Sequence, residues 1–97
     1  MEIINKSKTF FSISKAVAWQ VEQTNKYVYI MDLSNQQQYK FNDIAGDIWK
    51  MISNKKSMFE IYKEISLIYD AEIKQIQEDV DCFVNQLLEL NLIKTYK

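Results

Sequence analysis

The stretch QQYKFNDIAGDIW, residues 37–49, contains the point at which the hydrophobic pattern of this 97-residue chain changes period. At its start Tyr39 and Phe41 alternate with polar neighbours, and a period of two is typical of a half-buried strand. From Asn42 onward the apolar residues recur every three or four positions, which indicates an amphipathic helix with Asn42 as its N-cap. Gly46 is unfavourable inside that helix, so we expect another backbone to approach it closely.

Two further strands are expected upstream of the strand at residues 37–41. Residues 16–23 alternate in polarity, and residues 27–33 are rich in Tyr, Val and Ile. Short polar turns separate the three segments, so they predict a three-stranded antiparallel sheet. Residues 1–15 are polar with scattered apolar positions, and they are expected to be an N-terminal arm or a strand that docks late. The single domain is then expected to span residues 16–97.

Three helical segments are expected after the strands, over residues 42–53, 57–70 and 72–91. The second begins with Ser57 followed three residues later by Glu60, which is the pattern of a capping box. Runs of strands followed by runs of helices indicate an α+β domain, and a small sheet beside three helices is winged-helix-like.

The helix ends and the apolar stripes lead to further expectations. Asn54 and Asn91 stand where a helix end favours left-handed backbone, and Leu92 and Ile93 are expected to pack back after the second of them. In the second helix, the residues expected to face inward are Met58, Ile61, Ile65 and Ile68. In the third helix, the stripe consists of Ile73, Ile76, Val80, Phe83, Leu87 and Leu90, widened by Val84 and Leu88.

The composition excludes several classes of function. There is no His and only one Cys, Cys82, so a Cys–His nucleophile is excluded and too few soft ligands remain for a zinc site. An intramolecular disulfide is equally excluded, which suits a reducing compartment. No signal-peptide pattern and no apolar run of membrane-spanning length occurs, so we expect a cytoplasmic protein that is not an enzyme and needs no cofactor.

A winged-helix arrangement raises the alternative of a nucleic-acid-binding regulator. The helix that would read DNA, residues 72–91, carries one Lys, Lys74, against five acidic residues. All twelve basic residues of the chain are Lys, so the bidentate contact of Arg with guanine is unavailable. Because phosphate contacts supply most non-specific affinity, this charge pattern disfavours nucleic acid as a partner.

A peptide-binding interpretation uses the sheet edge instead. If the strand at residues 37–41 lies at an edge beside the third helix, a visiting peptide gains backbone hydrogen bonds on one side and apolar contacts on the other. The competing interpretation is that the stripe residues Ile76, Val80, Phe83 and Val84 all belong to the core. A third interpretation is a plain dimerisation module, in which the same free edge pairs two copies as a homodimer.

A family resemblance bears on this choice. The residues that carry it are Tyr39-Lys40-Phe41-Asn42-Asp43-Ile44-Ala45-Gly46-Asp47-Ile48-Trp49, Ile61 to Ile65, Tyr69, Asp79-Val80 with Phe83 and Leu87, and Asn91-Leu92-Ile93. In this ordered set the chain resembles the PqqD-like family, the RiPP recognition elements of ribosomally made, post-translationally modified peptide pathways. The resemblance covers residues 17–93. Phe41 stands where the family has Leu, Asn54 and Asn91 stand where Gly is common, and the Pro of the second strand is absent.

The resemblance implies a peptide chaperone without catalytic residues. Such proteins bind the leader segment of a precursor peptide, which adds as a strand to the third strand and packs against the third helix. They present the precursor to a modifying enzyme, such as a radical SAM maturase, a leader protease or a cyclase. Carried over by position, the peptide-binding residues are Gln37, Gln38, Tyr39, Lys40, Phe41, Lys74, Ile76, Asp79, Val80 and Phe83. Lys40 and Lys74 would pair with leader acids, and Asp79 and Glu72 would attract leader Lys.

Overall fold

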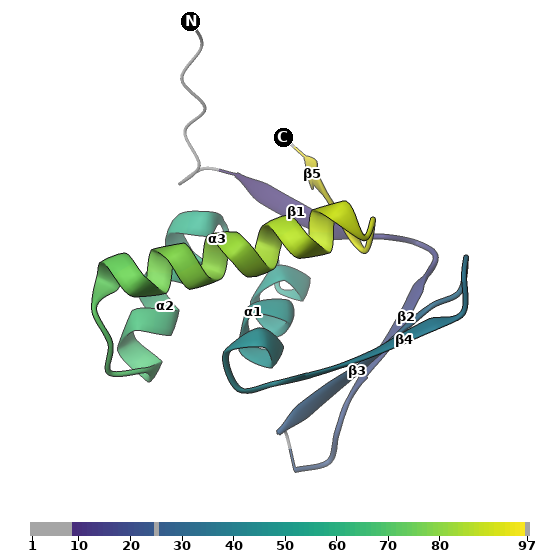
Figure 1. The fold of residues 1–97 in the computed structure, drawn as a ribbon, viewed down its shortest axis with the longest axis horizontal. Helices are drawn as coiled ribbons and strands as arrows, with labels where there is room; N and C mark the ends of the chain where they lie inside the picture. The colour runs from purple at the N-terminus through teal and green to yellow at the C-terminus, as the bar shows by residue number, and fades with distance from the viewer. Residues whose placement is uncertain (1–8, 25, 97) are drawn as a thin grey trace, which may run out of the picture.

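The computed structural model describes residues 9–24 and 26–96, and it has the α+β architecture that the sequence predicts. A three-stranded antiparallel sheet is followed by three helices, and a two-stranded ribbon pairs the first and last described strands (Figure 1). The elements are β1 (Phe10–Ile13), β2 (Val17–Val21), β3 (Tyr27–Asp32), β4 (Gln37–Asn42), α1 (Asp43–Ser53), α2 (Met58–Ile68), α3 (Ile73–Glu89) and β5 (Ile93–Tyr96).

The three-stranded sheet has the order β2-β3-β4, with β3 in the centre, and no other described strand pairs with the outer edge of β2 or of β4. Trp19, Ile30 and Tyr39 lie opposite one another across the three strands. The β3–β4 turn is held by the buried carboxylate of Asp32, which accepts hydrogen bonds from the N–H of Ser34 at 3.0 Å and from its hydroxyl at 2.6 Å. These two hydrogen bonds compensate the burial of the Asp32 carboxylate and hold the turn in one conformation. The turn in turn sets the register of β4 against β3.

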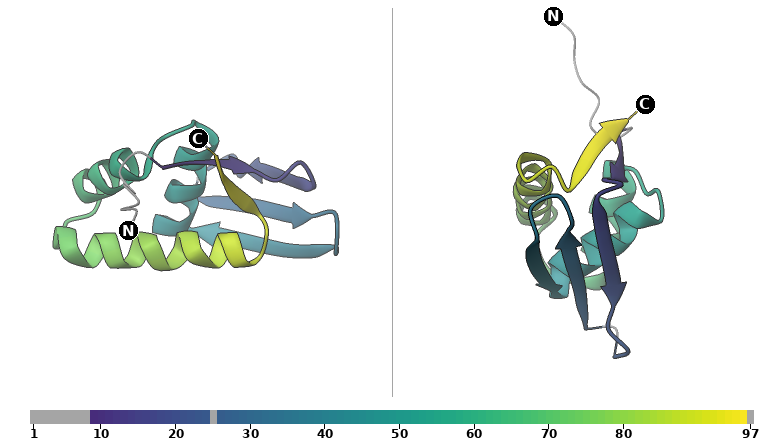
Figure 2. Two further views of the ribbon diagram at one scale, coloured as in Figure 1. Left: turned by 90° about the horizontal axis from the view of Figure 1, so that it is seen from above. Right: turned by 90° about the vertical axis from the view of Figure 1, so that its right-hand side faces the viewer.

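The ribbon of β1 and β5 brings the two ends of the described chain together (Figure 2). Within residues 1–15, Phe10–Ile13 form β1, and Phe11 lies in the core at 3% exposed, while residues 1–8 fall outside the described part. The sequence pattern predicted no strand at β5, because four residues that include Lys94 and Thr95 are too short and polar to show a period. Leu92 and Ile93 do pack back into the core, as expected.

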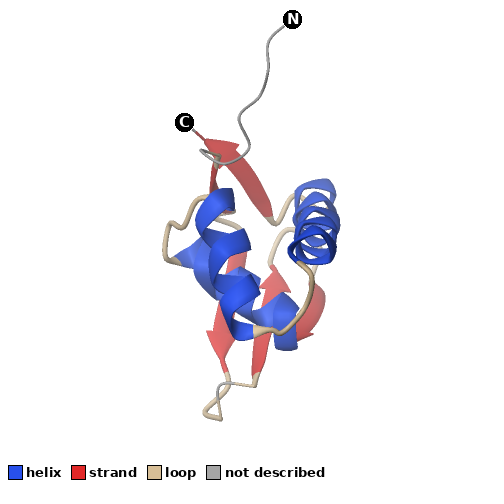
Figure 3. Cartoon of the chain, turned by 90° about the vertical axis from the view of Figure 1, so that its left-hand side faces the viewer, coloured by secondary structure: helices blue, strands red, loops and turns tan. Residues whose placement is uncertain are grey.

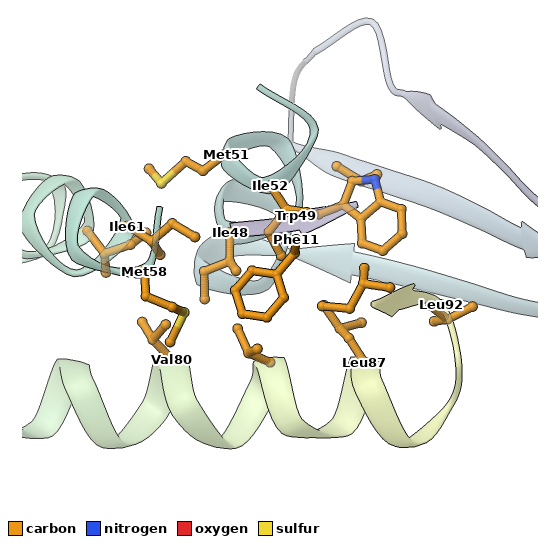
Figure 4. Packing of buried hydrophobic residues seen from close by; sticks show 14 of the residues in the cluster. Phe11, Ile48, Trp49, Met51, Ile52, Met58, Ile61, Val80, Leu87 and Leu92 are labelled. Atoms are coloured by element: carbon orange, nitrogen blue, oxygen red, sulfur yellow. The ribbon is translucent and has the colours of Figure 1, made fainter. Parts of the chain in front are cut away.

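The core lies between the helices and the inner face of the sheet, as Figure 4 shows for the side chains around Trp49. The helices occupy one end of the molecule and the three-stranded sheet projects from the other (Figures 1 and 3). A Cβ added at Gly46 would lie 3.3 Å from the backbone oxygen of Phe41, so a larger residue would push α1 away from β4. The close backbone approach expected at Gly46 is confirmed.

Two predictions about helix ends and faces are wrong. The left-handed residue after α1 is Lys55, with φ 63°, rather than Asn54, whose φ is −90°. The turn therefore closes one residue later than the sequence pattern places it. Ile68 was expected to face inward, but it is 56% exposed. It is the last residue of α2, past the part of the helix whose side chains are buried. Asn91 does adopt the left-handed conformation, with φ 59°.

The capping box of α2 is formed as predicted. The Ser57 hydroxyl accepts from the Glu60 N–H at 3.3 Å, and a Glu60 carboxylate oxygen accepts from the Ser57 N–H at 3.0 Å. The hydrogen bond from the Ser57 backbone, and after it the one from the Ser57 side chain, lowers the pKa of Glu60 below its ordinary 4.5. Glu60 therefore stabilises the fold above pH 4.5, and this contribution is lost as the pH falls through the lowered pKa. Asn42 holds the N-cap position of α1 without a side-chain cap bond.

Ser57→Ala is expected to lower the free energy of unfolding by about 1 kcal/mol, because the N–H of Glu60 loses its acceptor. Urea unfolding followed by circular dichroism at neutral pH measures the change. Ser66→Ala is the matched control in the same helix, since the exposed Ser66 hydroxyl only donates to the Lys63 carbonyl at 2.7 Å. The control is expected to change the free energy by less than about 0.5 kcal/mol. Equal losses in the two variants would refute the role of the cap.

Candidate functional site

The hydrogen-bond pattern of β3 decides which backbone groups of β4 are free. A central antiparallel strand directs successive residues alternately to its two neighbours. On the β2 side, the Glu22 N–H donates to the Tyr27 oxygen at 2.9 Å, and the Leu33 N–H donates to the Ala16 oxygen at 2.8 Å. The odd-numbered residues of β3 therefore bond with β2. Its even-numbered residues bond with their register partners on β4, which are Phe41 for Val28, Tyr39 for Ile30 and Gln37 for Asp32.

It follows that the N–H and C=O groups of Gln38 and Lys40 point away from β3, at the outer edge of β4. No strand in the described part of the chain pairs with this edge. Unpaired edge groups of this kind are a template for a further strand. In Figure 2 the same edge lies on the side of the sheet nearest α3.

A cluster of aromatic rings connects β4 to α3. The Phe41 ring meets the Phe83 ring of α3 edge to face, with ring centroids 5.1 Å apart. Phe41 also lies 5.9 Å from the ring of buried Trp49 and 6.3 Å from that of Tyr39. Tyr39, Phe41 and Phe83 are all half-buried, so each presents part of an aromatic surface beside the free edge.

The face of α3 that continues this surface follows from helix geometry. Each residue advances about 100° around a helix, so Leu90, seven residues after Phe83, returns to within about 20° of it. Leu90 is 43% exposed, and it belongs to the predicted stripe of the third helix but not to the predicted site residues. Its position seven residues after Phe83 is the signal that could have identified it. We call the backbone of Gln38 and Lys40 together with these apolar side chains the β4–α3 site: Tyr39, Phe41, Phe83 and Leu90.

The remaining residues predicted for the site are not all placed there. Ile76 and Val80 are 2% and 0% exposed, so they belong to the core and offer no surface to a visitor. Lys74 stands nine residues before Phe83, about 180° around the helix, and therefore on the opposite face of α3. Asp79 is exposed, within about 40° of Phe83, and accepts a hydrogen bond from Gln75 at 2.9 Å.

The Lys40 side chain lies on the opposite face of the sheet from Phe41, as alternation along a strand requires. Its ammonium sits over the ring of Tyr27, 4.1 Å from the centroid, and 5.9 Å from that of Tyr29. Lys40 therefore contributes its backbone to the β4–α3 site and its charge to the other face.

Two tyrosine–carboxylate hydrogen bonds hold the helices that carry the site. The Tyr62 hydroxyl of α2 donates to Asp81 of α3, and the Tyr69 hydroxyl, just after α2, donates to Asp47 of α1 at 2.6 Å. Burial, and then the neighbouring carboxylate, raises the pKa of each tyrosine well above its ordinary value of 10.0. Both hydroxyls thus remain protonated donors throughout the neutral range, and the helices keep their mutual positions.

The groups that the structure places at the β4–α3 site are backbone amides and carbonyls beside apolar side chains. Within residues 9–24 and 26–96 there is no cluster of three His, Cys, Asp or Glu residues that could hold a metal ion. In the same ranges, none of the helices has the length and apolar character needed to cross a membrane. The β4–α3 site offers backbone donors and acceptors beside aromatic surface, which is a set of groups suited to an extended peptide.

Comparisons with known proteins agree with this geometry. The family described as "Coenzyme PQQ synthesis protein D (PqqD)" matches residues 27–93. The structure entitled "TbiB1 in Complex with the TbiA(beta) Leader Peptide" is similar, with a TM-score of 0.80 and 21% identity over 88% of this chain and 96% of that one. "Lasso peptide synthetase B1 complexed with the leader peptide" has a TM-score of 0.77 and 15% identity over 87% and 96%. At these identities the likeness shows a shared fold. A comparison with curated proteins found no match.

Val80→Glu is expected to unfold the chain, whereas Leu90→Glu is expected to leave it folded. Val80 is fully buried, so the substitution places an unpaired carboxylate in the core, while Leu90, the C-cap residue of the same helix, is 43% exposed. Thermal unfolding followed by circular dichroism distinguishes the two. A folded Val80→Glu variant with an unchanged midpoint would contradict the burial described above.

Proposed function

Because the chain belongs to the PqqD family, we propose that it is a RiPP recognition element. It binds the leader segment of a ribosomal precursor peptide as an added strand on β4, beside α3, and presents the precursor to a modifying enzyme. The protein is a non-catalytic peptide chaperone in this proposal, and it acts in the cytoplasm, where precursor peptides are made.

The observation that carries the proposal is the free edge of β4 next to Phe83. Gln38 and Lys40 each present one N–H donor and one C=O acceptor, which a visiting strand satisfies in register. The hydrogen bonds are independent of the leader sequence and supply affinity. The side chains that the leader places against Tyr39, Phe41 and Phe83 supply selectivity, since alternate residues of an added strand point to the same face.

The alternation also predicts the chemistry of the leader. Residues on the inner face meet aromatic side chains and Leu90, so they are expected to be apolar. Residues on the outer face come near the ammonium of Lys40, which favours an acidic side chain there. Asp79, on the α3 side, favours a leader Lys near the end of β4. Lys74, on the far face of α3, remains available to the modifying enzyme after the leader has bound.

The two similar structures support the same ligand class, since both are complexes with leader peptides. The modifying enzyme is a radical SAM maturase, a leader protease or a cyclase in this proposal. A homodimer formed through the β4 edge is the competing use of the same hydrogen-bonding groups, and leader would then dissociate it. Nucleic-acid binding draws no support from the acidic third helix.

Leader binding is expected to slow amide hydrogen exchange at Gln38 and Lys40, whereas Tyr39 between them changes little. The N–H of Tyr39 is already bonded to β3, while those of its two neighbours face outward. The measurement uses NMR-detected exchange with synthetic candidate leader peptides, each covering the N-terminal half of a short reading frame sought next to the gene. Slower amide exchange in β2, with no change at Gln38 and Lys40, would contradict the placement of the peptide on β4.

Gln38→Pro is expected to lower the affinity for the leader peptide at least about tenfold, because proline removes an outward N–H that the sheet itself does not use. Isothermal titration calorimetry measures the affinity, and circular dichroism verifies the fold. Val21→Pro is the matched control, since it changes an outward N–H on the opposite edge of the same sheet. Peptide affinity that falls equally in both variants would count against β4 as the docking strand.

Leu90→Asp is expected to reduce leader affinity about tenfold, because it replaces apolar surface on the same side of α3 as Phe83, about two turns further along, with a charge. Leu67→Asp is its control, because Leu67 is a 79% exposed residue of α2 that lies outside the β4–α3 site. The same titrations measure both variants, and the control should match the unmodified protein. An unchanged affinity for Leu90→Asp would remove Leu90 from the site.

A further inference from the structure

The second edge of the sheet, on β2, has neither the charged residues nor the proline that often prevent edge strands from pairing. Edge strands are usually protected by charged residues, by proline, by a bulge or by a covering segment. The five residues of β2, VAWQV, contain neither a charge nor a proline, and no strand of the described chain pairs with their outer side. The β4 edge, by contrast, contains Lys40.

The outward groups of β2 follow from the same alternation that assigns those of β4. The backbone groups of Ala16 and Glu22 bond with β3. Because backbone groups alternate along a strand, those of Val17, Trp19 and Val21 point away from β3, toward the outer edge. The Val17 N–H is already used, since it donates to the Ser14 oxygen at 3.1 Å. Within residues 9–24 and 26–96, the outward N–H and C=O of Trp19 and of Val21 therefore have no strand partner, and neither has the C=O of Val17.

We propose that this edge pairs antiparallel with the same edge of a second copy of the chain, about a two-fold axis at Trp19. The segment VAWQV is nearly palindromic, so this register places Trp19 opposite Trp19 and Val17 opposite Val21. Each outward residue then meets an outward residue, as hydrogen-bonded antiparallel pairs require. A two-fold interface needs such self-complementarity, and this strand has it.

The side chains also favour this register. Trp19 is 39% exposed on the inner face, with its ring edge to face with buried Trp49 at 6.2 Å. Opposed tryptophans in a hydrogen-bonded pair would cover each other's exposed surface. Beyond the strand ends, Ala16 faces Glu22 of the second copy, which brings Lys15 close to an opposite charge. No like charges oppose each other.

The dimer leaves leader binding unaffected. It forms a continuous sheet of order β4-β3-β2-β2-β3-β4, so both β4 edges stay at the outer ends. The inference is independent of the proposed function, because it uses the opposite edge. A single strand pair is a small interface, so association is expected to be weak.

Sedimentation equilibrium of the whole chain tests this, over concentrations from about 1 μM to about 1 mM. The average mass is expected to rise from 11.6 kDa toward twice that value. The fluorescence of Trp19 is expected to shift to shorter wavelength in parallel, since Trp49 is already fully buried. A mass of 11.6 kDa at every concentration overturns the proposal.

Charge variants test the register, because Ala18 faces Gln20 of the second copy and both side chains are exposed. Ala18→Lys combined with Gln20→Lys is expected to weaken dimerisation at least tenfold. Ala18→Glu combined with Gln20→Lys is expected to strengthen it severalfold. Two charge variants that dimerise equally overturn the register.

Proline variants separate the two edges. Val21→Pro is expected to abolish the dimer and keep leader affinity, whereas Gln38→Pro is expected to keep the dimer and lose leader affinity. A dimer that is lost in Gln38→Pro and retained in Val21→Pro overturns the assignment to β2. Failure of leader binding in all proteins, with the dimer intact, counts against the proposed function alone.

Discussion

The contact of Phe41 with Trp49 and Phe83 is the interaction on which the rest of the structure depends. Phe41 stands near the end of β4. The centroid of its ring lies 5.9 Å from that of Trp49 in α1 and 5.1 Å from that of Phe83 in α3. Gly46 permits this arrangement, because its missing side chain lets α1 approach the backbone of Phe41. The aromatic contacts therefore fix the position of α3 beside the sheet edge, which is the geometry that peptide addition requires.

The central strand β3 gives the two edges of the sheet separate roles. Because its residues bond alternately to either side, the outward groups on β4 are those of Gln38 and Lys40, and those on β2 include Trp19. The β4 edge lies beside a helix that supplies an aromatic wall. The β2 edge carries a self-complementary segment. One small sheet thus offers a surface for a peptide and another for a second copy.

Much of this was predictable from the sequence because the responsible signals are local. The period changes at Asn42, and Ser57 with Glu60 forms the predicted capping box. Errors occurred where a local pattern permits several outcomes. Asn54 and Lys55 are adjacent, and backbone preference alone does not decide which one closes the turn. The β1–β5 ribbon escaped prediction because its pairing joins segments about eighty residues apart.

The sequence by itself determined the order of β2, β3, β4 and the three helices, the absence of a Cys–His nucleophile and the acidic character of the third helix, since these depend on residue type and spacing. Only the tertiary structure decided which stripe residues are surface. Ile76, Val80 and Phe83 share one apolar stripe, yet the first two are enclosed by the core and only Phe83 reaches β4. The physical reason is that a helix's apolar face is wider than its neighbours can cover, and the packing angle selects the part left exposed.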